Sequence, residues 1–197
     1  MHLNSKLLFE KYVRSYFKPG IKVLEIGPYG IPSLYQQLIN DPSIQWDTVD
    51  IAPCPGLTYT CQEYSFPIPD NSYDLVISGQ VLEHVKKIWV WMREVSRVCK
   101  QDGHVITINP VSFPYHEAPV DCWRIYPEGI KALYEDAGLE TVLSEWESLE
   151  WPGYKRYKPG ISVEYHGWRF QNFMPILGWL GMPVERAYDT VSVGRKK

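Results

Sequence analysis

Two groups of residues in this 197-residue sequence combine side chains that could bind a ligand or transfer a proton. The first group is residues 25–30, where Glu25 follows an apolar run and precedes a glycine-containing turn. Glycine allows the backbone to approach a ligand closely, and the helix expected after the turn offers unpaired amide groups. Asp50 stands 23 residues after Gly27. A carboxylate in that position can accept hydrogen bonds from both ribose hydroxyls of a nucleoside.

The second group places an imidazole, a carboxylate and a guanidinium close together in the sequence, at His116, Asp121 and Arg124. An imidazole has a pKa near neutrality, so His116 is the candidate catalytic base that takes a proton from a hydroxyl acceptor. Asp121 could orient the ring, and Arg124 could hold an anionic acceptor. In the structural alternative, which we favour for these two residues, Asp121 and Arg124 pair with each other and fix the loop.

Apolar and β-branched runs predict seven strands, and amphipathic segments between them predict helices. We expect strands over residues 22–26, 45–51, 58–61, 73–78, 104–109, 140–146 and 190–193. We expect helices over residues 5–17, 32–39, 81–99 and 127–137. Ser5 is expected to cap the first helix, and Pro32 to lie in the first turn of the second. This alternation predicts an α/β fold with a doubly wound, mostly parallel seven-stranded sheet and an antiparallel last strand, with ligands bound at the carboxyl ends of the strands.

Four segments occur in an order that resembles one enzyme family. They are VLEIG at 23–27, TVDI at 48–51, DNSYDLV at 70–76 and SGQVLEHV at 78–85. The series resembles the class I S-adenosylmethionine-dependent methyltransferases, in particular the methyltransferase type 11-like domain, over about residues 20–140. The resemblance implies a Rossmann-like methyltransferase fold, S-adenosylmethionine as the cofactor, and methyl transfer to a small-molecule acceptor.

The resemblance also implies which residues bind the cofactor. These are Glu25, Gly27, Pro28, Tyr29, Gly30, Asp50, Ile51, Gln62, Glu63, Ser78, Gly79, Gln80 and His84. The Gly27 turn would hold the methionine part, with Glu25 ordering the loop or the amino group. Asp50 would bind the ribose and Ile51 would pack on the adenine, whose amine Gln62 or Glu63 would contact. Residues 78–80 would line the wall beside the sulfur, and His84 would lie in the first turn of the next helix.

The turn after the first strand departs from the family pattern, which is usually Glu-x-Gly-x-Gly-x-Gly. Tyr29 and Ile31 occupy the second and third glycine places, with Gly30 between them. If the turn is re-routed through Gly30, the Tyr29 ring should point away from the methionine site. If the ring fills that site, the chain is a non-catalytic scaffold that has lost its cofactor. A nucleotide-binding oxidoreductase ranks last, because its Gly-x-Gly-x-x-Gly fingerprint is absent.

Composition argues against several other classes of protein. The net charge of −3 is unlike that of a dedicated nucleic-acid binder, whose affinity depends on neutralising phosphates. No apolar run reaches the roughly 18 residues that a membrane span needs, and the charged start is unlike a signal peptide, so we expect a cytoplasmic protein. The four cysteines form no Cys-x-x-Cys pair, so we expect free thiols and assign no metal ligands. The oligomeric state is left open.

An aromatic-rich segment precedes the predicted last strand. Residues 146–185 contain four tryptophans, interrupted by proline and glycine. We expect a single domain over residues 1–197 in which this segment is a cap insertion that closes the acceptor pocket opposite His116. The stretch from His116 to Arg124 is similar to that of family members associated with glycans or secondary metabolites. Since a hydroxyl acceptor must lose a proton and His116 is a candidate base, we expect oxygen as the acceptor atom, with nitrogen as the less favoured alternative.

Overall fold

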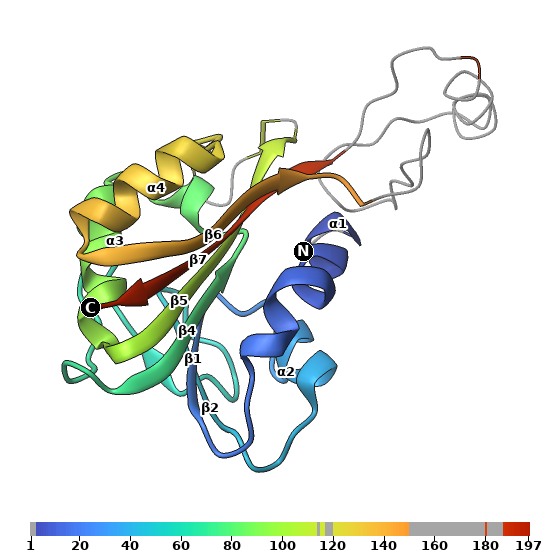
Figure 1. The fold of residues 1–197 in the computed structure, drawn as a ribbon. Helices are drawn as coiled ribbons and strands as arrows, with labels where there is room; N and C mark the ends of the chain where they lie inside the picture. The colour runs from blue at the N-terminus through green and yellow to red at the C-terminus, as the bar shows by residue number, and fades with distance from the viewer. Residues whose placement is uncertain (1–2, 114, 117–119, 150–179, 181–186) are drawn as a thin grey trace.

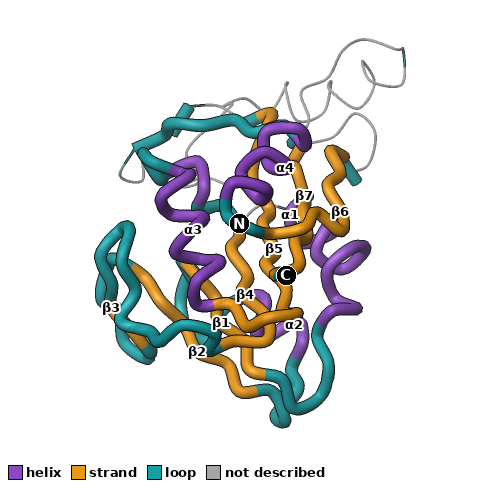
Figure 2. Tube along the Cα trace, turned by 60° about the vertical axis from the view of Figure 1, so that its left-hand side comes forward, coloured by secondary structure: helices purple, strands orange, loops and turns teal. Residues whose placement is uncertain are grey.

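The computed structural model describes residues 3–113, 115–116, 120–149, 180 and 187–197. One seven-stranded sheet has the order β3-β2-β1-β4-β5-β7-β6 (Figure 1). Its strands are β1 (Lys22–Ile26), β2 (Gln45–Asp50), β3 (Tyr59–Thr60), β4 (Tyr73–Gly79), β5 (Cys99–Ser112), β6 (Leu139–Glu147) and β7 (Tyr188–Lys196). The first five strands pair in parallel, whereas β7 is antiparallel to both β5 and β6. The predicted doubly wound sheet is confirmed, and Figure 2 shows β3 and β6 at its opposite edges.

Helices cover both faces of the sheet (Figure 1). They are α1 (Leu3–Leu8), η1 (Phe9–Val13), η2 (Arg14–Tyr16), α2 (Leu34–Ile39), η3 (Leu82–His84), α3 (Ile88–Val98) and α4 (Pro127–Asp136). Alternate strand residues face opposite sides, so each face has its own apolar core. Leu75 and Ile77 pack with Phe9 and Tyr35 on the α1–α2 side. The other core includes Val76 of the same strand and lies on the α3–α4 side.

The predicted continuous helix over residues 81–99 is wrong. The chain forms the short η3, turns away from helical geometry at Val85 and Lys87, and starts α3 at Ile88. The indole Nε1 of Trp123 donates a hydrogen bond to the Val85 carbonyl oxygen at 2.8 Å. That carbonyl is therefore satisfied by a residue distant in the sequence, which allows the break. At its other end α3 gives way to β5 at Cys99, so this strand begins earlier than predicted.

Two predicted helix starts are also wrong. Ser5 lies within α1, is buried, and accepts a hydrogen bond from Gln80 Nε2 at 2.9 Å, so it does not cap the helix. Pro32 precedes α2, and Ser33 is its N-cap, because the Ser33 Oγ accepts a hydrogen bond from the Gln36 amide at 3.1 Å. A serine at that position satisfies an amide that the helix leaves unpaired.

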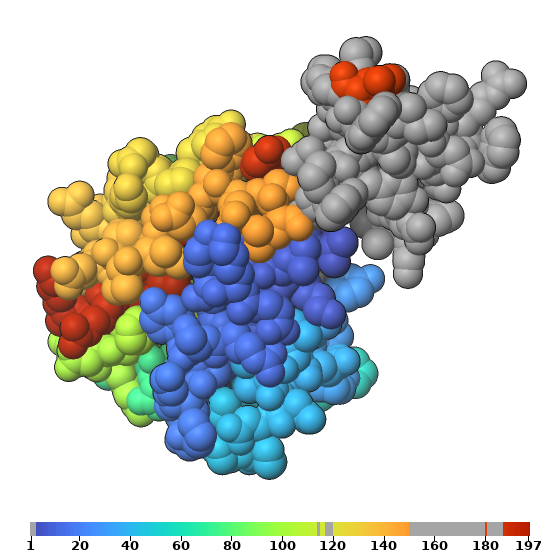
Figure 3. Space-filling view, turned by 45° about the vertical axis from the view of Figure 1, so that its right-hand side comes forward, coloured from blue at the N-terminus to red at the C-terminus, as the bar shows by residue number. Residues whose placement is uncertain are grey.

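The N-terminal helices border β6 and α2 in the space-filling view (Figure 3). Glu147 at the end of β6 accepts hydrogen bonds from Lys11 Nζ and Tyr12 Oη, both at 2.7 Å. The predicted cap over residues 146–185 lies outside the described residues, apart from 146–149 and 180. Among the helices that the structure describes, none has the length and apolar character to cross a membrane.

Candidate active site

Strand register brings the main predicted ligand residues to one edge of the sheet. Ile26 at the end of β1 pairs with Val49 of β2 on one side and with Ser78 of β4 on the other. The residues that follow these three in the chain are Gly27, Asp50 and Gly79. They therefore lie side by side at the carboxyl edge of the sheet. The Gly27 amide donates a hydrogen bond to the Val49 carbonyl oxygen at 2.9 Å, which holds the start of the turn against β2.

The turn after β1 requires glycine at its first position. Gly27 has φ +69°, and a Cβ added there would lie 2.3 Å from Val81 Cγ2. Gly30 has φ +82°, but the space that an added Cβ would occupy is open. The Tyr29 side chain is 93 % exposed, so its ring projects into solvent and is not buried in a pocket. This is the behaviour expected of a re-routed turn.

Glu25 orders the turn from below. Its buried carboxylate accepts hydrogen bonds from Ser33 Oγ and, at 3.0 Å, from Trp46 Nε1. Burial raises the pKa of Glu25 to about 7, although the two hydrogen bonds act in the opposite direction. Of the two roles implied by the family resemblance, this geometry favours ordering of the loop.

The end of β2 presents a carboxylate next to an exposed apolar side chain. Asp50 Oδ1 accepts a hydrogen bond from the Ala52 amide at 2.9 Å, and the neighbouring Ile51 is 51 % exposed. A polar acceptor beside an apolar surface suits a ribose joined to a flat base. Of the two candidates for the adenine amine, Glu63 Oε1 already accepts from the Lys86 amide at 3.2 Å, whereas Gln62 is exposed. The arrangement favours Gln62.

The end of β4 combines an unpartnered hydroxyl with a crowded glycine. Ser78 is buried, and within the described residues its Oγ has no hydrogen-bond partner. Gly79 packs so closely on α2 that an added Cβ would lie 2.2 Å from the Tyr35 hydroxyl oxygen. The Gln80 side chain turns toward α1 and β7, because its Nε2 donates to Ser5 and to Asp189 Oδ1. Of these three residues, Ser78 has the buried polar group that a ligand could satisfy.

The three residues predicted for acceptor chemistry lie together after β5. The Asp121 side chain is 1 % exposed; its Oδ2 accepts a hydrogen bond from the His116 amide at 2.8 Å and lies 3.4 Å from His116 Nδ1. Arg124 donates to both Asp121 oxygens, at 2.5 and 2.6 Å, and also to the carbonyl oxygens of Phe113 and Trp123. Burial raises the pKa of Asp121, but the hydrogen bonds from Arg124 and His116 outweigh it and lower the pKa. The geometry favours a loop-fixing role for Arg124.

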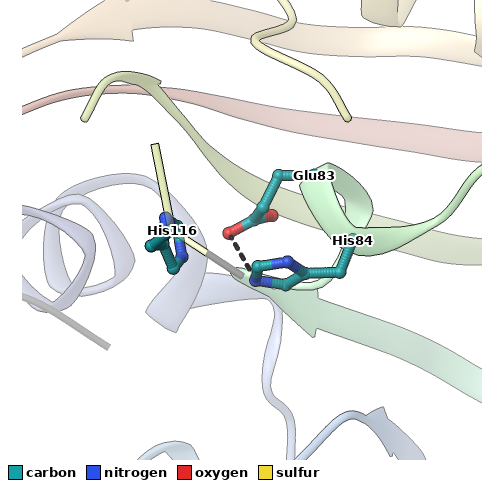
Figure 4. Close-up of side chains that lie close together, drawn as sticks. All are labelled: Glu83, His84 and His116. Carbon is teal, nitrogen blue, oxygen red and sulfur yellow. Dashed lines mark ion pairs between the residues drawn. The ribbon is translucent and has the colours of Figure 1, made fainter. Parts of the chain in front are cut away.

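Glu83 is a residue at this site that sequence reasoning missed. Its side chain is buried, and neither carboxylate oxygen has a hydrogen-bond partner among the described residues. Burial raises its pKa to about 8. The adjacent His84 lies in η3 rather than in the predicted long helix, and its ring centroid is 5.0 Å from that of His116 (Figure 4). The adjacency of Glu83 and His84 is visible in the sequence, but their proximity to His116 is not.

Known proteins resemble this chain in sequence and in fold. Residues 41–107 match the family model described as a methyltransferase domain. The uncharacterized methyltransferase YcgJ of Bacillus subtilis (strain 168) is 27 % identical over 110 residues, which are 53 % of this chain and 41 % of the relative. The uncharacterized protein YafE of Escherichia coli (strain K12) is 33 % identical over 87 residues, 43 % of this chain and 39 % of the relative. The matches thus span about two fifths of either relative.

A solved structure agrees over nearly the whole chain. It is an S-adenosylmethionine-dependent methyltransferase from Archaeoglobus fulgidus, with a TM-score of 0.63 and 16 % identity. The similarity covers 98 % of this chain and 94 % of that protein, so the two share a fold. The match over residues 41–107 and the likeness in fold thus make this chain similar to S-adenosylmethionine-dependent methyltransferases in both sequence and fold.

Proposed function

We propose that this protein transfers the methyl group of S-adenosylmethionine to an oxygen atom of a small-molecule acceptor. The observation that carries the proposal is the register that sets Gly27, Asp50 and Gly79 side by side at the carboxyl edge of the sheet. In an open α/β sheet this edge is where nucleotide-like ligands bind. The family match supports the same reaction class.

The residues present fit the cofactor. The space beside the Gly30 backbone is open, the Tyr29 ring is in solvent, and Ser78 has a buried hydroxyl without a partner among the described residues. Asp50 would accept hydrogen bonds from the ribose, and Ile51 would pack on the base. S-adenosylmethionine, when bound, supplies a methyl group already activated on a sulfonium, so the protein needs mainly to position the acceptor and exclude water.

Proton removal from the acceptor is assigned to His116. A hydroxyl must lose its proton as it attacks carbon, and imidazole suits this role near neutral pH. The Asp121 carboxylate next to His116 Nδ1 would hold the ring in one orientation. Arg124 is a positioning residue in this proposal, because its hydrogen bonds fix Asp121 and the Phe113 carbonyl. An acceptor related to glycans or secondary metabolites is the substrate class proposed.

Calorimetric titration tests cofactor binding. Wild-type protein is expected to bind S-adenosylmethionine and not NAD. Asp50→Ala should weaken the affinity about tenfold or more, since charge-assisted hydrogen bonds are each worth roughly 1.5–3 kcal/mol. Glu128→Ala, which removes an exposed carboxylate of α4, is the matched control and should leave affinity unchanged. Absence of S-adenosylmethionine binding would favour the scaffold alternative, and binding of NAD the oxidoreductase.

A second experiment tests the acceptor and the base. Release of S-adenosylhomocysteine is measured with a panel of hydroxyl compounds and matched amines. His116→Gln should lower kcat by roughly 10²–10⁴-fold with little change in cofactor affinity. If only amines are methylated, the acceptor atom is nitrogen and not oxygen. If His116→Gln keeps full activity, His116 does not take the proton.

A further inference from the structure

Three potential metal ligands from two separate segments meet next to the candidate active site. Glu83 and His84 belong to η3, and His116 lies in the segment after β5. One ligand atom from each side chain lies within 4.8 Å of the other two. Figure 4 shows the Glu83 carboxylate directed toward the two imidazole rings, with its Oε1 at 3.7 Å from His84 Nε2.

Each imidazole in this cluster is oriented by an acceptor at Nδ1. The Val120 carbonyl oxygen lies 2.5 Å from Nδ1 of His84, and Asp121 Oδ2 lies 3.4 Å from Nδ1 of His116. A carbonyl or carboxylate in this position fixes the tautomer with the proton on Nδ1, which directs the lone pair of Nε2 to a ligand. Metal-binding histidines typically have such an outer partner.

The buried Glu83 carboxylate gives a second observation that points to a cation as its ligand. It is 1 % exposed, and both of its oxygens lack a hydrogen-bond partner in the described part of the chain. A buried polar group without a hydrogen-bond partner costs free energy. A bound cation would supply the partner that the described residues do not provide.

We propose that Glu83, His84 and His116 bind a divalent transition-metal ion, with zinc as the representative ion. Two imidazole nitrogens with one carboxylate are a donor set of catalytic zinc sites, whereas magnesium and calcium prefer oxygen ligands alone. Ligand atoms around tetrahedral zinc are about 3.3 Å apart, given metal–ligand distances near 2 Å. The pair at 3.7 Å is close to this spacing, and the wider separations in the cluster require side-chain rotation to close.

Three protein ligands leave a fourth position for water or an acceptor oxygen. This inference goes beyond the proposed function and does not rest on it, because ion binding is measured without methyl donor or acceptor. The two are linked at His116. An imidazole nitrogen that holds zinc cannot take a proton, so the proton-accepting role assigned to His116 applies to the metal-free protein.

The test uses full-length, tag-free and reduced protein freed of metal with a chelator. Competition with a chromophoric zinc indicator should show one zinc per chain, and zinc should raise the melting temperature. Glu83→Gln, His84→Gln and His116→Gln should each weaken zinc binding at least about tenfold, since loss of even an outer partner of a ligand typically costs about 10–100-fold in metal affinity. His104→Gln is the control, because that histidine packs on Tyr16 and contributes nothing to the cluster.

A thiol site is the main competing source of zinc binding. Cys54 and Cys122 are exposed free thiols, and Cys122 follows the loop next to the cluster. Cys54→Ser and Cys122→Ser should each retain full zinc affinity. The proposal is overturned if wild-type protein binds no zinc and shows no thermal shift, if affinity is lost with either serine variant, or if all three cluster variants bind as wild type does. The thermal shift of wild-type protein keeps the test valid if a cluster variant fails to fold.

Discussion

The amide nitrogen of Cys122 donates a hydrogen bond to the Glu83 carbonyl oxygen at 2.7 Å. This bond joins the segment after β5 to η3, the short helix after β4. The Trp123 indole makes a second bond to the same region, at Val85. The two segments that carry Glu83, His84 and Asp121 are therefore fixed to each other, so a change in one is expected to alter the geometry of the other.

We predict that Asp121→Asn loosens this region. The variant removes the charge that pairs with Arg124 and accepts from the His116 amide, and loss of such a buried partner costs about 1–3 kcal/mol in the free energy of unfolding. The pKa of Asp121 is lowered in the fold, so its stabilisation is present at neutral pH and is lost as pH falls below the unfolded value near 4. Denaturant unfolding at pH 7 and pH 3 measures both effects. A difference from wild type that does not shrink on acidification would contradict the ion pair.

Gly27→Ala should abolish S-adenosylmethionine binding and destabilise the protein. Alanine at φ +69° costs about 1–2 kcal/mol in backbone strain, and the clash with Val81 adds about 1–3 kcal/mol. Gly20→Ala is the matched control, since Gly20 has φ +79° with open space around an added Cβ. Chemical unfolding of the two variants separates strain from crowding. If both variants lose the same free energy of unfolding, the close packing at Gly27 does not contribute to stability.

Tyr29→Ala should have almost no effect. A side chain that is 93 % exposed contributes little, so we expect less than about 0.5 kcal/mol in the free energy of unfolding and less than about a twofold change in cofactor affinity. Calorimetry with S-adenosylmethionine measures the second value. Binding that becomes tenfold tighter would mean that the ring obstructs the methionine site in solution.

Glu25→Gln should change the pH dependence of stability. The folded protein keeps the Glu25 proton up to about pH 7, whereas the unfolded chain releases it near pH 4.3, so wild-type stability is lost as pH rises between these values. Glutamine does not titrate. Between pH 5 and pH 8, the free energy of unfolding of the variant should rise relative to that of wild type by about 1 kcal/mol or more, as measured by urea unfolding. Parallel stability curves would show that Glu25 does not titrate in this range.

Local patterns in the sequence were sufficient to predict the strands and the positions of Gly27 and Asp50. The strands follow from runs of apolar residues, which are local in the sequence, and the two positions follow from the rule that ligands bind at the carboxyl ends of parallel strands. The break at Val85 could not be predicted, because the hydrogen bond that satisfies its carbonyl comes from Trp123. Glu83 was missed for a related reason: it belongs to a segment whose apolar pattern predicts a helix, and its neighbour His116 reaches it only in the folded chain.

The antiparallel strand β7 lies between β5 and β6, although it follows both in the chain. The strand β7 joins β6 to the rest of the sheet. During synthesis the ribosome must therefore release β6 and a further 40 residues, 148–187, before β7 begins to emerge. Until then β5 has an open edge, and β6 has no partner in the sheet. Removal of residues 188–197 would leave the nascent protein in that state permanently, with two edges available for pairing with other chains.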